Sequence, residues 1–327
     1  MSRHRSGTNW SWLRWLIEYN LRQLPEFQKD FRLKKRIEAL GQGLFHRNYL
    51  FQAGGAFLVL RLSKIERGCQ SRKEAVTSLR KEAKTLQALE AFDLPFEVPR
   101  LVCLVRDDSV EPVGLIESAV SGWPLLSGSG NETSLQIIAK VAGAIHHLPK
   151  TGFPHLKMRA DSHSHVMEQL DAFPLSLFDD FEEALHARDW ILRHASSERP
   201  SVVLHGDLLP QNLLVDRSKT GRTAVVDGES AGIGDPAYDL AIVTCGTRKP
   251  LGITGGSQLL VDLYNESAPQ SIEPEAVTVH ELLFHLDWLA EAAKRKRNKE
   301  AGGHGPDHHA GSIRSILRRA QTGSNRD

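Results

Sequence analysis

The chain has 327 residues, which is long enough to bury a substantial core. Its 41 Lys and Arg nearly balance 40 Asp and Glu, and the net charge of +1 argues against nucleic acid as the main partner. No apolar run approaches the ~20 residues of a membrane span, and no apolar core of a signal peptide follows the basic first residues. The cysteines, Cys69, Cys103 and Cys245, are widely spaced and form no C-x-x-C motif, which predicts reduced thiols in a cytoplasmic protein.

The first predicted element is a helix within residues 9–36, so residues 1–36 are expected to form an N-terminal helical extension. Pro25 ends the pattern. Packing on the following domain or on a second subunit is favoured, because Glu18 and a modest basic content argue against the alternative of a membrane-surface helix. The apolar positions at helical spacing are Leu13, Leu16, Ile17, Leu21 and Leu24, flanked by Trp12, Trp15 and Tyr19.

Residues 37–62 change to a strand pattern. Gly54-Gly55 between two apolar runs is typical of a hairpin. On the second strand, alternation places Phe57, Val59 and Arg61 on one face and Leu58, Leu60 and Leu62 on the other, whereas Lys64 lies past the strand with the opposite parity. Before the hairpin, Gly41 and Gly43 could let backbone amides approach phosphates, or form only a turn.

Residues 71–92 predict a helix whose apolar side carries Val76, Leu79, Leu86 and Leu89. Two further strands are expected at residues 98–102 and 113–117, and Ser118-Ala119 follows the second. Another core helix is expected over residues 135–148. Residues 166–195 are helical and acidic, which favours a solvated face over a pocket for a cationic substrate.

The last predicted helix covers residues 279–293, and residues 296–327 are expected to be a flexible basic tail. One face of the helix is apolar and should be buried. The opposite face could be a plain surface with one half-exposed Trp. The buried set is Leu282, Leu283, Leu286, Leu289, Ala290 and Ala293, and the opposite set is His280, Phe284, Asp287, Trp288 and Glu291.

Three short apolar runs, at residues 201–204, 213–215 and 224–226, predict buried strands in one small sheet. Polar residues follow these strands and should converge at one edge of that sheet. A kinase needs a carboxylate to accept the proton of the attacking hydroxyl, and an Asn and a second Asp to hold Mg²⁺. Asp207, Asn212 and Asp227 supply these groups at this spacing, and Mg²⁺ prefers such oxygen ligands.

The motifs H-G-D-x-x-x-x-N, V-V-D-x-E and G-D-P-A-x-D-L-A in residues 205–241 resemble those of the aminoglycoside phosphotransferase and choline kinase family. The resemblance covers roughly residues 37–295. It implies an α+β, bilobal, protein-kinase-like fold. A small N-lobe with an antiparallel sheet (residues 37–119) would bind the nucleotide. A mostly helical C-lobe (residues 120–295) would carry out catalysis and bind the acceptor.

The resemblance assigns a role to each residue of the catalytic segment. Asp207 would be the catalytic carboxylate, while Asn212 and Asp227 would hold Mg²⁺. Glu229 would contact a second Mg²⁺ or brace the loop. His205 and Asp239 would support the loop structurally, and an Asp at the start of a helix also suits the helix dipole.

The resemblance also implies the ATP site. Gly41 and Gly43 resemble the phosphate-covering loop, and Arg61 takes the place of the usual phosphate-binding lysine, with Glu82 as its partner. The backbone from Glu117 to Ala119 matches the interlobe hinge that hydrogen-bonds adenine. In the acceptor pocket, Asp287, Trp288 and Glu291 would suit an amine or ammonium group.

The sequence thus predicts an ATP–Mg²⁺-dependent phosphotransferase that moves the γ-phosphate to a hydroxyl of a small molecule such as an aminoglycoside, choline or a sugar. The acceptor and the oligomeric state stay open. Because Arg61 departs from the usual lysine, a catalytically weak nucleotide-binding regulatory module is an alternative. H-G-D, D-G-E and the lack of an A-P-E segment count against a protein kinase.

Overall fold

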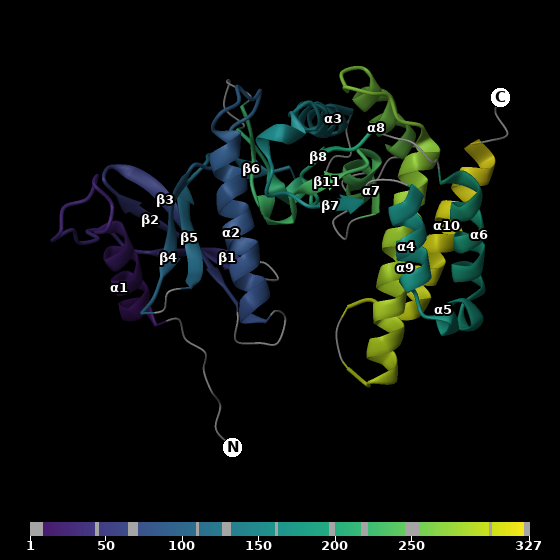
Figure 1. Ribbon diagram of the computed structural model, residues 1–327, viewed down its shortest axis with the longest axis horizontal. Coiled ribbons are helices and arrows are strands. Elements are labelled where there is room, and N and C mark those ends of the chain that lie inside the picture. Colours follow the sequence, from purple (N-terminus) through teal and green to yellow (C-terminus); the bar gives the residue numbers. More distant parts are fainter. Residues whose placement is uncertain are drawn as a thin grey trace. The chain divides into compact units, whose positions relative to one another are not determined.

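The computed structural model describes ten stretches of the chain. They are residues 9–42, 46–64, 71–108, 111–125, 132–160, 163–195, 200–216, 222–245, 256–300 and 303–323. The chain divides into two compact units. Unit 1 comprises residues 1–121 and 224–229, and unit 2 comprises residues 122–223 and 230–327. Figure 1 labels the elements of both.

Unit 1 is built on an antiparallel five-stranded sheet with the order β1-β2-β3-β5-β4. Gly54 and Gly55 form the β2–β3 turn with φ of 56° and 84°, values that glycine adopts without strain. This is the predicted hairpin. The strands are β1 (Glu38–Gln42), β2 (His46–Ala53), β3 (Ala56–Ser63), β4 (Leu101–Arg106) and β5 (Pro112–Ser118).

Helices cover the two faces of this sheet, α1 (Trp10–Leu21) on one and α2 (Arg72–Leu89) on the other (Figure 1). The face that carries Leu58 and Leu60 packs with α1 in one hydrophobic cluster, so the N-terminal helix packs within unit 1. Burying one such leucine contributes about 1.5–3 kcal/mol. Arg61 points to the opposite face, where it meets Glu82 of α2.

Unit 2 is mostly helical. Its helices are α3 (Glu132–His146), α4 (His163–Ala172), α5 (Leu175–Asp180), α6 (Glu182–His194), α7 (Ala237–Cys245), α8 (Gly256–Asn265), α9 (Pro274–Arg297) and α10 (Pro306–Gly323). Its short strands are β6 (Trp123–Pro124), β7 (Met158–Ala160), β8 (Val202–Leu204), β9 (Leu213–Val215) and β11 (Gly232–Gly234). No helix among the described residues is both long and apolar enough to cross a membrane.

The expectation that the three catalytic-segment strands share one sheet is wrong for the first of them, β8. β8 pairs with β11, which pairs in turn with β7, whereas β9 pairs with β6. β10 (Thr223–Val225) spans the boundary between the units. Short apolar runs predict strands but not their partners, because pairing is set by the rest of the fold.

The flexible tail expected at residues 296–327 is also contradicted. Residues 306–323 form α10, whose Ile313 and Ile316 are buried in a cluster with α6 and α9. Pro306 begins the helix, where its missing N–H costs nothing. Apolar residues recur three and four positions apart, but glycines, histidines and arginines around them mask the pattern.

Candidate active site

Arg61 lies at the centre of a buried polar cluster in unit 1. It is 5% exposed, and its Nη1 donates to Glu82 Oε1 at 2.7 Å. Its Nη2 donates to Asp227 Oδ1 at 2.6 Å. The structure therefore brings together three of the residues that the sequence predicted for the nucleotide and metal site.

The cluster around Arg61 holds more carboxyl groups than the single positive charge of this arginine can neutralise. Burial opposes the charged form of Arg61, but the carboxylates of Glu82, Asp227 and Glu117 outweigh it and raise the pKa of the guanidinium above its usual range. Burial raises the pKa of Glu82 despite Arg61. Burial likewise raises the pKa of Glu117 to about 8, with Arg61 opposing the shift. One arginine thus serves several buried carboxyl groups, so an added cation or a proton would stabilise the cluster.

Asp227 is held in an uncommon backbone conformation two residues after the end of β10. Its φ of 70° is in the left-handed region, which few non-glycine residues adopt. Upstream, Val225 N–H donates to Glu97 O at 2.8 Å and so anchors the strand. Strain of this kind costs on the order of 1 kcal/mol and persists where the surroundings fix the residue. The Asp227 carboxylate is presented to Arg61 by this turn.

His46 is a member of the cluster that the sequence reasoning missed. Its Nδ1 lies 3.0 Å from Glu229 Oε2 and 3.5 Å from Arg61 Nη2, and it is 4% exposed. The alternation of side chains along β2 is the sequence signal that could have identified His46. Asn48 pairs with Arg61 across β2 and β3, and His46 is two residues from Asn48 on the same face.

The predicted adenine hinge already uses two of its backbone donors. Ser118 N–H donates to Arg100 O at 2.9 Å, and Ala119 N–H donates to Phe57 O at 3.0 Å. The Glu117 side chain is buried, and Glu117 pairs with Val59 of β3. Val59 is two residues from Arg61, so Glu117 lies on the same face of the sheet as Arg61. Of the two candidate phosphate-loop glycines, Gly41 lies in β1 and Gly43 lies outside the described residues.

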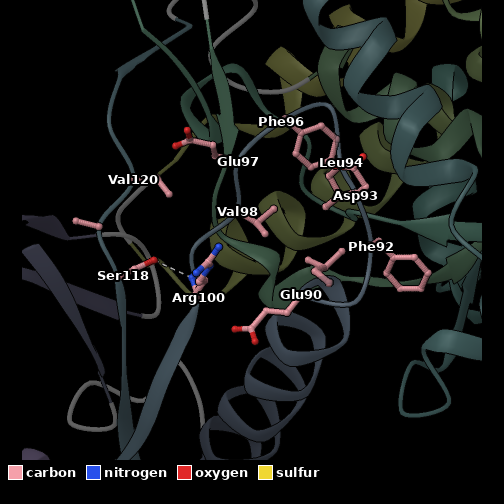
Figure 2. A pocket seen from close by; sticks show the side chains of 12 residues that line it. Glu90, Phe92, Asp93, Leu94, Phe96, Glu97, Val98, Arg100, Ser118 and Val120 are labelled. Carbon is pink, nitrogen blue, oxygen red and sulfur yellow. Dashed lines mark hydrogen bonds between the residues drawn. The ribbon is translucent and has the colours of Figure 1, made fainter. Parts of the chain in front are cut away.

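A pocket of about 620 Å³ borders the hinge residues within unit 1 (Figure 2). Residues 118–120 form one side of it, and the end of α2 with residues 92–98 forms the other. In Figure 2, Arg100 N–H donates to the Ser118 hydroxyl, at 2.8 Å. The charged side chains around the pocket, Glu90, Asp93, Glu97 and Arg100, are exposed, so the pocket is a solvated depression rather than a dry cavity.

Asp207 and Asn212 lie together on the loop of unit 2 that the sequence predicts to be catalytic. Asn212 is 6% exposed and donates from Nδ2 to Asp207 O at 2.8 Å and to Asp207 Oδ2 at 3.0 Å. Gly206 precedes them with a φ of 77°, a value that favours glycine. Because the amide nitrogen of Asn212 serves Asp207, its Oδ1 is the atom that can act as a metal ligand.

Asp239 holds the start of this loop. Its two carboxylate oxygens accept hydrogen bonds from His205 N–H and Gly206 N–H, each at 2.8 Å. It is fully buried, which disfavours its charge, but its contacts with His146, His205 and Gly206 lower its pKa all the same. The supporting role implied for Asp239 thus has a physical basis in two backbone donors.

His146 extends the support of the loop to α3 and α8. Its Nε2 lies 3.2 Å from Asp239 Oδ2, and its Nδ1 lies 2.8 Å from the Tyr264 hydroxyl. Burial and the nearby carboxylates of Asp239 and Asp235 raise the pKa of Tyr264, so the hydroxyl keeps its proton. Sequence analysis gave His146 and Tyr264 no role, because His146 is 93 residues from Asp239 and 118 residues from Tyr264 along the chain.

The acceptor candidates lie together on α9. Burial and the charge of Glu291 raise the pKa of Asp287, one turn away. Trp288 stacks on Phe284 with ring centroids 5.8 Å apart. His280, expected on this outward face, is instead 3% exposed, and its Nε2 is 3.2 Å from Asp235 Oδ2. The outward face of α9 is therefore acidic and aromatic, and it does not include His280.

The residues present suit Mg²⁺. Asn212, Asp227 and Glu229 carry the hard oxygen donors that Mg²⁺ prefers. Within the described part of the chain, no group of three His, Cys, Asp or Glu residues is placed to hold a metal ion by itself.

Residues 36–267 match the model of the APH phosphotransferase enzyme family. The chain belongs to this family. An aminoglycoside 3'-phosphotransferase of Streptomyces fradiae is 31% identical over 173 residues, which cover 49% of this chain and 62% of that protein. The chain therefore matches less than two thirds of the length of this relative.

Solved structures share the fold of this phosphotransferase-family chain at low identity. One is a thermostable mutant of the aminoglycoside phosphotransferase APH(4)-Ia in a ternary complex with AMP-PNP and hygromycin B. It has a TM-score of 0.63 and 17% identity, and the match covers 92% of this chain and 98% of that one. A choline/ethanolamine kinase family protein from Mesorhizobium loti has a TM-score of 0.57 and 16% identity, over 92% and 93%. The predicted family and the α+β kinase-like fold class are confirmed.

Proposed function

We propose that this protein transfers the γ-phosphate of ATP to a hydroxyl of a small molecule. The observation that carries the proposal is the fixed pair of Asp207 and Asn212. A carboxylate held by an amide at 3.0 Å, on a loop braced by a buried aspartate, is oriented before the substrate arrives. Asp207 would accept the proton of the attacking hydroxyl.

The phosphates would be held mainly by unit 1. Arg61 remains charged and presents a planar guanidinium, which suits phosphate oxygens. Bound Mg²⁺ would neutralise charge on the phosphates, and Asn212, Asp227 and Glu229 supply the proposed ligands. The remaining work of the chain is positioning and charge stabilisation, with no covalent enzyme intermediate.

The acceptor would be a hydroxylated molecule with a cationic group. Asp287 and Glu291 provide carboxylates one turn apart on α9, and Trp288 is half-buried beside them. An ammonium group is attracted both by carboxylates and by the face of an indole ring. The relatives named for aminoglycosides and for choline or ethanolamine support this class of acceptor.

The test is ADP release with Mg-ATP and a panel of aminoglycosides, choline, ethanolamine and neutral sugars. We expect release with at least one cationic acceptor, and loss of that release in Asp207→Asn. Asp287→Asn should raise the KM for that acceptor and leave the KM for ATP unchanged. A preference for neutral sugars would contradict the assigned acceptor class but not the phosphotransfer.

A nucleotide-binding regulatory module is the second candidate, favoured by one observation. Arg61 replaces the usual lysine and is occupied by two carboxylates. For such a module, Mg-ATP should raise the melting temperature while no acceptor releases ADP. The ordered Asp207–Asn212 pair favours the enzyme over this alternative.

A further inference from the structure

Exposed aromatic side chains gather on one face of α1, on the surface of unit 1. Trp12, Trp15 and Tyr19 are 42%, 39% and 41% exposed, and Trp15 stacks on Tyr19 with ring centroids 5.3 Å apart. At about 100° per residue, these three positions project within roughly 60° of one another. We call them the aromatic strip. The adjoining side of the helix is buried in the hydrophobic cluster with the sheet through Leu13, Leu16, Ile17 and Leu21.

Such a strip differs from the scattered apolar residues found on most surfaces. Single exposed aromatics need no explanation, but a contiguous group marks a contact surface. Tryptophan and tyrosine combine an apolar body with a polar N–H or O–H. They are therefore suited to a boundary that is apolar on one side and wet on the other.

A positively charged segment runs along the same helix. The basic segment consists of Arg32, Lys34, Lys35 and Arg36, all exposed. Arg14 fastens it to α1 by donating to Leu33 O and, at 3.3 Å, to Lys35 O. Glu18 of α1 also holds this segment, since it accepts from Leu33 N–H at 2.9 Å and lies 3.6 Å from Arg32. Glu18 is three residues from Trp15, a spacing that makes helix side chains neighbours, so the basic segment lies beside the aromatic strip.

The negative charge of α1 itself is already neutralised. Glu18 is 7% exposed and lies within 4 Å of Arg14, Arg22 and Arg32, at 3.8, 3.0 and 3.6 Å. It also accepts from Leu33 N–H at 2.9 Å. Residues 9–38 hold seven Lys and Arg against four Asp and Glu, in a chain whose net charge is +1. The positive surplus therefore belongs to this segment of the chain.

We propose that the aromatic strip and the basic segment form a peripheral docking surface for an anionic lipid bilayer. The rings would enter the headgroup region, and the lysines and arginines would contact lipid phosphates and carboxylates. A second copy of the chain suits this surface less well. Both copies would bring the same positive surplus to such an interface, and like charges oppose the contact.

The sheet of unit 1 separates α1 from the Arg61 cluster. α1 covers the face of the sheet that carries Leu58 and Leu60, whereas Arg61 points to the face covered by α2. A bilayer bound along α1 would therefore not contact the Arg61 cluster. Docking and phosphotransfer are separable properties, and either one can fail without the other.

The test is sedimentation of the full-length protein with vesicles. One set contains phosphatidylcholine alone, and the other contains phosphatidylcholine with phosphatidylserine. We expect binding to the anionic set that weakens as salt rises, with a blue shift of tryptophan fluorescence. Trp12→Ser/Trp15→Ser and Lys34→Glu/Lys35→Glu should each lower the partition coefficient about tenfold or more. Trp123→Ser, at a residue that is 67% exposed in unit 2, is the matched control and should bind like the wild type.

Equal binding to both vesicle sets, or wild-type binding by the double-tryptophan variant, would overturn the proposal. So would a concentration-dependent dimer in ultracentrifugation that the tryptophan changes abolish, in a protein that ignores vesicles. The lysine changes are at exposed positions and keep the test valid if the tryptophan variant does not fold. Unchanged melting temperatures show that the folds are intact.

Discussion

Arg61 and Asp227 are 166 residues apart in the sequence, and the guanidinium Nη2 of one meets the carboxylate Oδ1 of the other at 2.6 Å. The same guanidinium holds the buried Glu82 through Nη1. The proposed phosphate-binding cation thus also neutralises a proposed magnesium ligand. Changes at Arg61 should therefore act on stability and on nucleotide binding together.

Replacing Arg61 with Ala should destabilise the fold and raise the KM for ATP. It leaves the Glu82 carboxylate buried without its cation, and breaking a buried ion pair in this way costs about 3–5 kcal/mol. Arg61→Lys should recover part of both properties, because a lysine keeps the charge but not the fork that reaches two carboxylates. Denaturant unfolding and ATP-dependence of turnover measure the two effects.

Lys64→Ala is the control for Arg61, because Lys64 follows the strand with the opposite parity. It should leave the KM for ATP near the wild-type value. Wild-type kinetics in both Arg61 variants combined with an impaired Lys64 variant would assign the phosphate contact to Lys64.

Asp207→Asn should remove most phosphotransfer and spare ATP binding. The substituted amide oxygen can still accept from Asn212, so the loop geometry is kept while the proton acceptor is lost. General-base contributions are typically 10²–10⁴-fold, so kcat should fall on the order of that range. The ATP-induced melting shift should stay. Turnover at the wild-type rate would remove Asp207 from the catalytic role.

Much of the Arg61 cluster in unit 1 is predictable from strand parity. The alternation of Phe57, Val59 and Arg61 shows which way Arg61 points, because side chains alternate along a strand. His46 obeys the same rule on the neighbouring strand. It escapes prediction because its face is known only once the register of β2 against β3 is known.

Other features depend on tertiary contacts that local patterns do not encode. The Ala119 N–H is taken by Phe57 O, and no sequence motif predicts that hydrogen bond. The link from Tyr264 through His146 to Asp239 joins three helices. α10 has an apolar period, but its surrounding composition is typical of a tail.

Asp239→Asn should destabilise the protein and lower kcat, although the change is nearly isosteric. Both oxygens of Asp239 accept backbone N–H groups, and asparagine offers only one acceptor, so one buried donor loses its partner. An unsatisfied buried donor costs about 1–3 kcal/mol. Tyr264→Phe is the milder control, because it removes only the hydroxyl at the far end of the link. Asp239→Asn should lower both the free energy of unfolding and kcat more than Tyr264→Phe does.

Glu117 should make stability fall as pH rises. Its pKa is raised by burial from 4.5 to about 8 in the folded protein. The folded state therefore binds more protons than the unfolded state between these values, and the free energy of unfolding decreases with pH in this window. One group contributes at most about 1.4 kcal/mol per pH unit. Glu117→Gln should remove this slope, so that the variant gains on the wild type from pH 4.5 to about pH 8.

Glu90→Gln provides the comparison for Glu117, because Glu90 is exposed at the end of α2. Its free energy of unfolding should stay close to that of the wild type, because an exposed side chain loses few contacts on substitution. A difference between Glu117→Gln and the wild type that stays constant across the window would show that Glu117 takes up no extra proton on folding.

Mg-ATP should raise the stability of the wild type, and the gain should depend on Asp227. At a free ligand concentration 100 times the Kd, binding to the folded state adds about 2.7 kcal/mol. That corresponds to several degrees of melting temperature at ~2–4 °C per kcal/mol. The shift should shrink when Mg²⁺ is removed, and shrink likewise in Asp227→Asn. Asparagine can still accept from Arg61, so the loss is that of a metal ligand rather than of the ion-paired fold. Asp287→Asn, on α9, should show the full shift.

Identical melting with and without Mg-ATP would refute both the enzyme and the nucleotide-binding module, since each requires the complex. A full shift in Asp227→Asn would instead leave ATP binding intact and move the metal to other ligands.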